Sequence, residues 1–138
     1  GTSPLSQYVI CELLTAGIEE AHLRVIRAHY RARRDAMLAA LERHLPGYFT
    51  WTRPEGGLFV WGTMPEGYDA RELLRRALAR GVAFVAGAPF YPDDPPANTF
   101  RLNFSNTGPE RIAEGVERLG QAVAELERDA ARAAAAAE

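Results

Sequence analysis

The side chain best suited to chemistry is Arg101, in the middle of a run that alternates between apolar and polar residues. Side chains of a β-strand point alternately to opposite faces. The apolar residues of the run therefore face a core, whereas Arg101 shares the other face with Thr99, Asn103 and Ser105. A guanidinium in a sheet is costly without an anionic partner, and its planar fork matches a carboxylate or a phosphate. We therefore expect Arg101 either to bind such an anion or to be a solvated or internally paired charge.

The chain contains no lysine: all 16 of its basic residues are arginines. No side chain in it can therefore form a Schiff base with a carbonyl compound, as an active-site lysine does. Any reaction that Arg101 serves must take part of its machinery from outside this sequence.

The other residue types that support catalysis or metal binding form no recognisable arrangement. His22 and His29 lie seven residues apart in an expected helix and His44 is distant, which favours a solvated helix face over a metal site. Cys11 lies in an apolar helical run, so we expect a packed thiol there. No glycine-rich phosphate loop, Ser/His/Asp set or pair of carboxylates stands out.

Composition indicates one soluble globular domain, since the chain has 138 residues, 47% of them hydrophobic and 25% charged. A net charge of −2 argues against binding to nucleic acid or to an anionic membrane, and no apolar run approaches the roughly 20 residues of a membrane span. The N-terminus lacks the features of a signal peptide, and the single cysteine excludes an internal disulfide, so we expect a cytoplasmic location. The initial glycine suggests a processed or truncated chain.

Hydrophobic periodicity and breaker residues predict the elements that would position Arg101. Helices with an apolar stripe are expected at residues 4–16, 19–45, 69–80 and 107–126. Strands are expected at residues 48–52, 57–61, 82–86 and 99–105, the third of them buried. The segment 87–98 contains four prolines and should form a loop. This order predicts an α/β fold of the α+β sandwich type, with a small mixed or antiparallel sheet of about four strands and helices mainly on one face.

Two helix starts resemble capping boxes, Asp69 with Glu72 and Thr107 with Glu110. The alanine-rich residues 129–138 either extend the last helix or are disordered, because alanine offers little to pack. We therefore divide the chain into a domain at residues 1–128 and a tail at residues 129–138.

Several short motifs occur in a characteristic order and spacing over roughly residues 5–127. They are QYV at 7–9, YRARRDAM at 30–37, PEGGLFVW at 54–61, GVAFVAG at 81–87, FY at 90–91, RLNFS at 101–105 and EGVERLG at 114–120. Together they resemble the C-terminal small domain of fold-type I, class I/II, pyridoxal-phosphate-dependent aminotransferases. The resemblance is strongest to the branch that includes 2-aminoadipate, kynurenine and broad-specificity enzymes.

In that family the arginine of the RLNFS-type strand binds the α-carboxylate of the amino-acid substrate, which implies this role for Arg101. Asn103, on the same face, would orient Arg101. Phe90 and Tyr91 would either line the pocket for the substrate side chain or pack internally. The lysine that holds pyridoxal 5′-phosphate, the acid beside its pyridine nitrogen and the donors to its phosphate lie in the large domain and in the partner subunit of the family's enzymes.

The resemblance therefore implies the C-terminal part of a homodimeric enzyme that transfers an amino group from an amino acid to a 2-oxo acid. The chain itself would supply Arg101, Asn103, Phe90 and Tyr91 for substrate binding, but no catalytic, cofactor-binding or metal-binding residue. Without the large domain it should be inactive and bind no cofactor covalently.

Two alternatives stay open at this point. MocR-type transcription regulators join a DNA-binding head to the same aminotransferase-like fold, and their C-terminal part would look much the same. A stand-alone domain that binds a carboxylate or a protein is the other alternative. The sequence upstream of Gly1 would distinguish the three, since it would encode a large domain, a DNA-binding head as well, or nothing.

Overall fold

A computed structural model describes residues 19–87 and 97–138 of the chain. Within these ranges the chain forms three helices and four strands. In chain order they are α2 (Glu20–His44), β1 (Thr50–Trp51), β2 (Phe59–Thr63), α3 (Ala70–Ala79), β3 (Val85–Ala86), β4 (Thr99–Asn103) and α4 (Pro109–Ala137). The expected helix at 4–16 and most of the expected loop at 87–98 lie outside the described residues.

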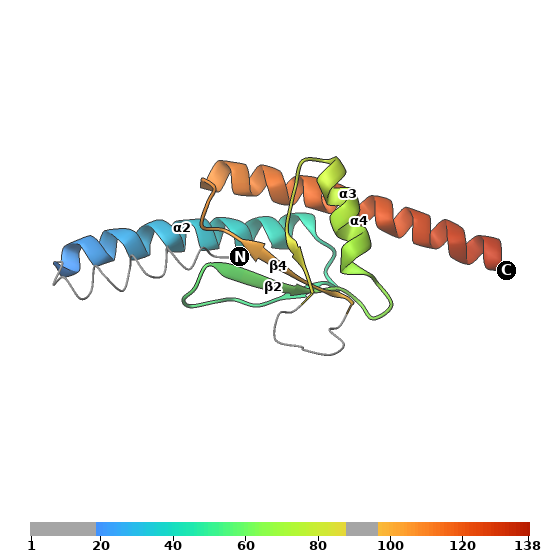
Figure 1. The fold of residues 1–138 in the computed structure, drawn as a ribbon, viewed down its shortest axis with the longest axis horizontal. Helices are drawn as coiled ribbons and strands as arrows, with labels where there is room; N and C mark the ends of the chain where they lie inside the picture. Colours follow the sequence, from blue (N-terminus) through green and yellow to red (C-terminus); the bar gives the residue numbers. More distant parts are fainter. Residues whose placement is uncertain (1–18, 88–96) are drawn as a thin grey trace.

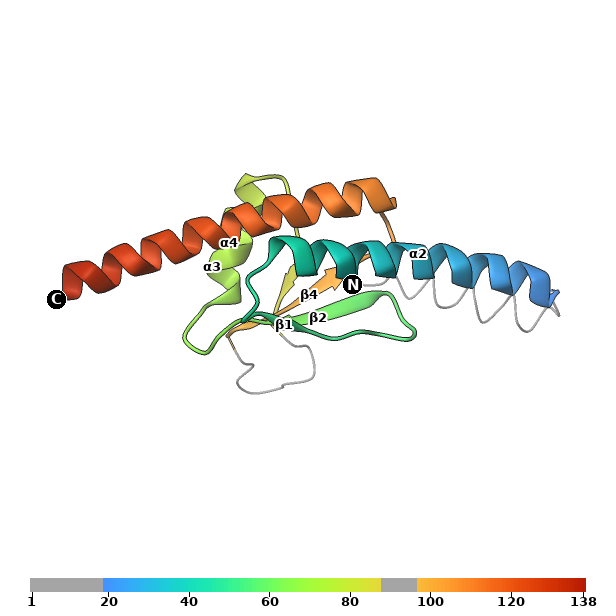
Figure 2. The same cartoon turned by 180° about the vertical axis from the view of Figure 1, so that it is seen from behind.

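The strands form one antiparallel sheet in the order β1-β2-β4-β3. The long helices α2 and α4 run side by side over one face of this sheet, and α3 lies at the end near β3 (Figures 1 and 2). The C-terminal part of α4 continues beyond the sheet (Figure 1). This arrangement confirms the predicted α+β fold, with the antiparallel form of the sheet and helices on one face.

The core lies between the helices and the sheet, and β4 contributes to it as its alternation predicts. Phe100, Leu102 and Phe104 are 1%, 6% and 1% exposed, whereas the intervening Arg101 and Asn103 are only half-buried. Phe100 on β4 is directly opposite Gly62 on β2. A Cβ added to Gly62 would lie 2.3 Å from the Phe100 ring, so only glycine lets this ring cover the neighbouring strand.

The helices follow their apolar stripes closely, but only one of the two capping predictions has support. Helix α2 lies within one residue of the predicted 19–45 at each end. Asp69 caps α3 by accepting a hydrogen bond from the Arg71 backbone N–H at 2.9 Å. At α4 the cap residue is Gly108 and no side chain caps it, so the predicted role of Thr107 is wrong. Pro109, with its preset φ, occupies the first helical position there instead.

The strands are shorter than predicted, and β3 differs most. The predicted buried strand at 82–86 pairs only at Val85–Ala86, and Val85 is 41% exposed. The prediction of burial is wrong because, among the described strands, β3 lies at the edge of the sheet and pairs with β4 alone. The other end of the chain is regular, since α4 continues through the alanine-rich tail to Ala137. Among the described helices, none has the length and apolar character that crossing a membrane requires.

Candidate functional site

Arg101 lies at the centre of the sheet face that the helices leave uncovered. Its cross-strand neighbours are Trp61 on β2 and Val85 on β3. Asn103, two residues after Arg101 on β4, pairs with Phe59 on β2. Directly paired residues share a face, so these five side chains lie on the side opposite the core. We call Phe59, Trp61, Val85, Arg101 and Asn103 the open face.

The guanidinium of Arg101 is held against aromatic rings. Its central carbon, Cζ, lies 4.1 Å from the centre of the Phe59 ring and 5.7 Å from the Trp61 ring. Both distances are within the range of cation–π attraction. No acidic side chain in residues 19–87 or 97–138 forms an ion pair with Arg101, which gives no support to the internal salt bridge considered as an alternative.

Asn103 uses its side-chain oxygen locally. The backbone N–H of Ser105 donates to Oδ1 of Asn103 at 2.7 Å, and the Ser105 hydroxyl donates to the same oxygen at 2.6 Å. These two bonds close the turn that follows β4. No hydrogen bond joins Asn103 to Arg101 in the part of the chain that the structure describes, so the orienting role of Asn103 stays a prediction. Phe90 and Tyr91 lie outside the described residues.

Sequence reasoning did not find the two aromatic neighbours of Arg101. Phe59 and Trp61 stand two residues apart in an expected strand, which places them on one face, but their partner depends on which strand lies next to β2 and in which register. A signal was present in the alternation of the run FVWGT, whose half-buried positions are those two aromatics. The alternation alone could not say that Arg101 would lie opposite.

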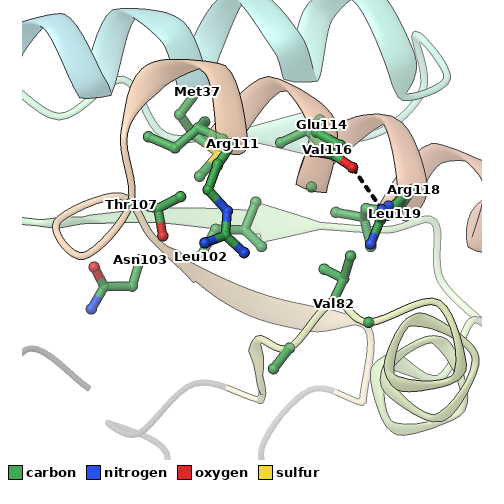
Figure 3. A pocket seen from close by; sticks show the side chains of 14 residues that line it. Met37, Val82, Leu102, Asn103, Thr107, Arg111, Glu114, Val116, Arg118 and Leu119 are labelled. Atoms are coloured by element: carbon green, nitrogen blue, oxygen red, sulfur yellow. Dashed lines mark hydrogen bonds and ion pairs between the residues drawn. The ribbon is translucent and has the colours of Figure 1, made fainter.

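A cavity of about 260 Å³ lies elsewhere, on the helix side of the sheet, between α4, the end of β4 and residues 81–83. Figure 3 shows Arg111 extending from α4 toward β4 across this cavity, with the Glu114–Arg118 ion pair (2.6 Å) beside it. Asn103 contributes to its lining, but Arg101 does not. The cavity and the open face therefore meet at Asn103, but the cavity does not include Arg101.

The largest group of paired charges joins α3 to α4. Arg76 contacts Asp129 at 2.6 Å, Glu125 at 3.0 Å and Glu72 at 3.1 Å, and Glu72 also pairs with Arg75. The hydrogen bond from Arg75 holds the pKa of Glu72 below its ordinary value, and the bond from Arg76 does the same for the pKa of Asp129. Because every charge here has a partner, this cluster acts as a link between helices.

No cluster of His, Cys, Asp and Glu side chains suited to a metal ion occurs in the described ranges. The arrangement on the open face can bind a planar anion, because attraction to a ring face holds the guanidinium without using its N–H donors in an ion pair. The chemistry that the open face offers is therefore recognition of a carboxylate or a similar group.

Comparison with known proteins gives consistent matches along the chain. The profile of the family described as aminotransferase class I and II matches residues 2–119. Aromatic-amino-acid aminotransferase 1 of Thermococcus litoralis is 43% identical over 124 residues, which are 90% of this chain and 30% of that protein. The crystal structure of LysN, an alpha-aminoadipate aminotransferase from Thermus thermophilus, superposes with a TM-score of 0.78 at 44% identity, covering 90% of this chain and 32% of LysN.

A relative of another kind is an uncharacterized HTH-type transcriptional regulator, YdfD of Bacillus subtilis, which is 32% identical over 126 residues, or 91% of this chain and 26% of that protein. The chain thus spans about a third or less of each of these proteins.

Proposed function

Because the chain belongs to the aminotransferase class I and II family, we propose that it is the C-terminal part of a pyridoxal-phosphate-dependent aminotransferase in which Arg101 binds the substrate α-carboxylate. The observation that carries this proposal is the state of Arg101 on the open face. Its central carbon lies over the Phe59 ring, 4.1 Å from the ring centre, and the guanidinium forms no ion pair within the described residues. A carboxylate from outside the chain would supply the missing anion.

The residues of this chain do not by themselves fit the cofactor. A Schiff base with pyridoxal 5′-phosphate needs a lysine, and all 16 basic residues are arginines. The cofactor's lysine and its other ligands must therefore come from the remaining two thirds of the parent protein. The chain alone should be inactive and bind no cofactor covalently.

Within the parent, the contribution of this chain is to orient the substrate. A forked pair of hydrogen bonds from Arg101 fixes both oxygens of a carboxylate, and so fixes the direction of the bonds at the adjacent carbon. Holding a reacting group in one geometry removes much of the entropic barrier to reaction. Asn103, Phe90 and Tyr91 are the further substrate-binding residues that we propose, and residues 1–128 form the domain that carries them.

The substrates of the parent would be an amino acid and a 2-oxo acid, and the large domain together with a second subunit of a homodimer would complete the site. A cytoplasmic location fits the single cysteine of the chain.

The test is the Arg101→Ala variant of the full-length parent. We expect kcat/KM for the amino donor to fall by a factor that corresponds to about 2–5 kcal/mol, as when one member of a buried charge pair is removed. The absorption spectrum of the bound cofactor should not change, because Arg101 does not hold it. An unchanged kcat/KM would refute the assignment.

The similarity to YdfD supports a second candidate, the ligand-sensing part of a MocR-type transcription regulator. Arg101 would then bind the carboxylate of an effector, and turnover would be absent. The segment that precedes this chain in its gene distinguishes the two, because a regulator carries a DNA-binding head before the aminotransferase-like part. Finding such a head would replace the enzyme proposal with this one.

A further inference from the structure

Two aromatic side chains, Phe59 and Trp61, contact the guanidinium of Arg101 from the neighbouring strand. Across the β2–β4 pair, Trp61 is directly opposite Arg101. Phe59 is directly opposite Asn103, so Phe59 is a diagonal neighbour of Arg101. Diagonal neighbours are within reach of long side chains on a sheet surface. Cζ of Arg101 lies nearer to the diagonal ring, at 4.1 Å, than to the direct one, at 5.7 Å. The arginine side chain therefore leans along the strand and rests on Phe59.

We propose that Phe59, assisted by Trp61, is a positioning residue that holds the Arg101 guanidinium with its N–H donors free for a carboxylate. This proposal rests on the proposed function of Arg101. An aromatic ring attracts the cation through its face without accepting the in-plane hydrogen bonds that a carboxylate partner would use up. An internal salt bridge would hold Arg101 equally well but would compete with the substrate. Contact with a ring fixes the cation and leaves its N–H donors available to a carboxylate.

The physical benefit is preorganisation. A free arginine side chain has many rotamers, and binding a substrate must restrict them to one. A guanidinium that already rests on a ring loses less freedom when the carboxylate arrives, so binding is tighter without any new contact to the substrate. The same contact removes water from one side of the cation and strengthens its charge-assisted hydrogen bonds.

This role differs from that of a residue that only lines the substrate pocket. A pocket wall would affect every ligand of the same shape, whether charged or neutral. A positioning residue of Arg101 would affect only ligands that carry the carboxylate. The difference can be measured with two probes of one carbon skeleton, 4-methylpentanoate and its neutral amide, 4-methylpentanamide.

The experiment uses the full-length parent and calorimetric binding of the two probes. For Phe59→Leu we expect the Kd of 4-methylpentanoate to rise about 3- to 30-fold, the range of a cation–π contact, while the Kd of the amide stays the same. Phe59→Tyr keeps the ring and should bind both probes as the wild type does. Tyr48→Leu removes an exposed aromatic residue outside the open face and serves as the matched control.

A second readout does not depend on ligand binding or on the stability of a variant. In an NMR spectrum of the wild-type protein, the Nε proton of Arg101 should be shifted upfield by the ring current of Phe59. An Arg101 signal at the position of exposed arginines would overturn the proposal. Equal weakening of both probes by Phe59→Leu would also overturn it, as would no weakening of either.

Failure of the proposed function would look different. If Arg101→Ala binds 4-methylpentanoate as tightly as the wild type does, Arg101 is not the carboxylate site and both proposals fall. If Arg101→Ala loses the carboxylate probe and Phe59→Leu does not, only the positioning role falls.

Discussion

Arg76 on α3 and Arg101 on β4 are both partly buried arginines, but their guanidinium groups have opposite surroundings. Arg76, whose side chain is 12% exposed, contacts three carboxylates within 3.1 Å. Arg101 contacts two aromatic rings and no carboxylate of the described residues. Arg76 joins elements that are more than 40 residues apart in sequence, whereas the contacts of Arg101 within residues 19–87 and 97–138 are with neighbouring strands of its own sheet.

The difference shows that the side chains in contact with an arginine determine whether its hydrogen-bond donors are available to a ligand. The donors of Arg76 are consumed by its own chain, so a ligand would have to displace carboxylates to reach them. The donors of Arg101 lie at an open face, and the contact that holds the group is with the Phe59 ring instead. An internally satisfied arginine stabilises the fold, whereas we propose that an arginine held by an aromatic ring serves recognition.

The comparison is tested most strongly by removing the paired arginine. We expect Arg76→Ala to lower the free energy of unfolding of the 138-residue chain by about 1–2 kcal/mol, because each exposed pair contributes at most about 1 kcal/mol and some packing is lost as well. Thermal denaturation measures this change. Arg71→Ala, at an exposed position of the same helix, is the matched control and should have little effect.

In the full-length parent, Arg76→Ala should leave kcat/KM unchanged when it is assayed well below its melting temperature. Arg101→Ala should show the reverse, with lost activity and a nearly unchanged melting temperature. If Arg76→Ala reduced activity as much as Arg101→Ala does, the division between a structural and a recognition arginine would be wrong.

The pH dependence of stability sharpens the same comparison. Hydrogen bonds from Arg75 and Arg76 hold the pKa values of Glu72 and Asp129 below their ordinary values. A depressed carboxyl pKa contributes stability that is complete above the pKa of the unfolded chain and is lost as pH falls through that of the folded chain. The stability difference between the wild type and Arg76→Ala should therefore be constant near neutrality and shrink below about pH 5. Denaturant titrations at several pH values measure it. The part due to lost packing should remain at pH 2, whereas a difference as large at pH 2 as at pH 7 would contradict the expectation.

The parts of the fold that depend on local sequence could be predicted. Helix α2 has a long apolar stripe closed by Pro46-Gly47, and its predicted ends are correct to one residue. The alternation in β4 assigns Phe100 to the core and Arg101 to the other face, and burial confirms both assignments. These features need only the period of a helix or a strand.

The parts of the fold that depend on pairing between distant segments could not be predicted from the sequence. The aromatic neighbours of Arg101 follow from the register of β2 against β4, about 40 residues away, which no local pattern specifies. The edge position of β3, which leaves Val85 exposed, depends on the order of strands in the sheet. The contact of Arg76 with Asp129 spans 53 residues and crosses the predicted boundary between domain and tail.

Truncating the chain near the predicted boundary at residue 128 should have the smallest effect on stability. The residues that follow Asp129 in α4 are all exposed, so ending the chain at Ala130 should change the free energy of unfolding by no more than about 0.5 kcal/mol. Ending it at Arg128 also removes Asp129, a partner of Arg76, and should lower the melting temperature further. Equal melting temperatures for the two truncations would show that Asp129 adds nothing to the Arg76 cluster. The folded domain would then end at residue 128, as the sequence alone predicts.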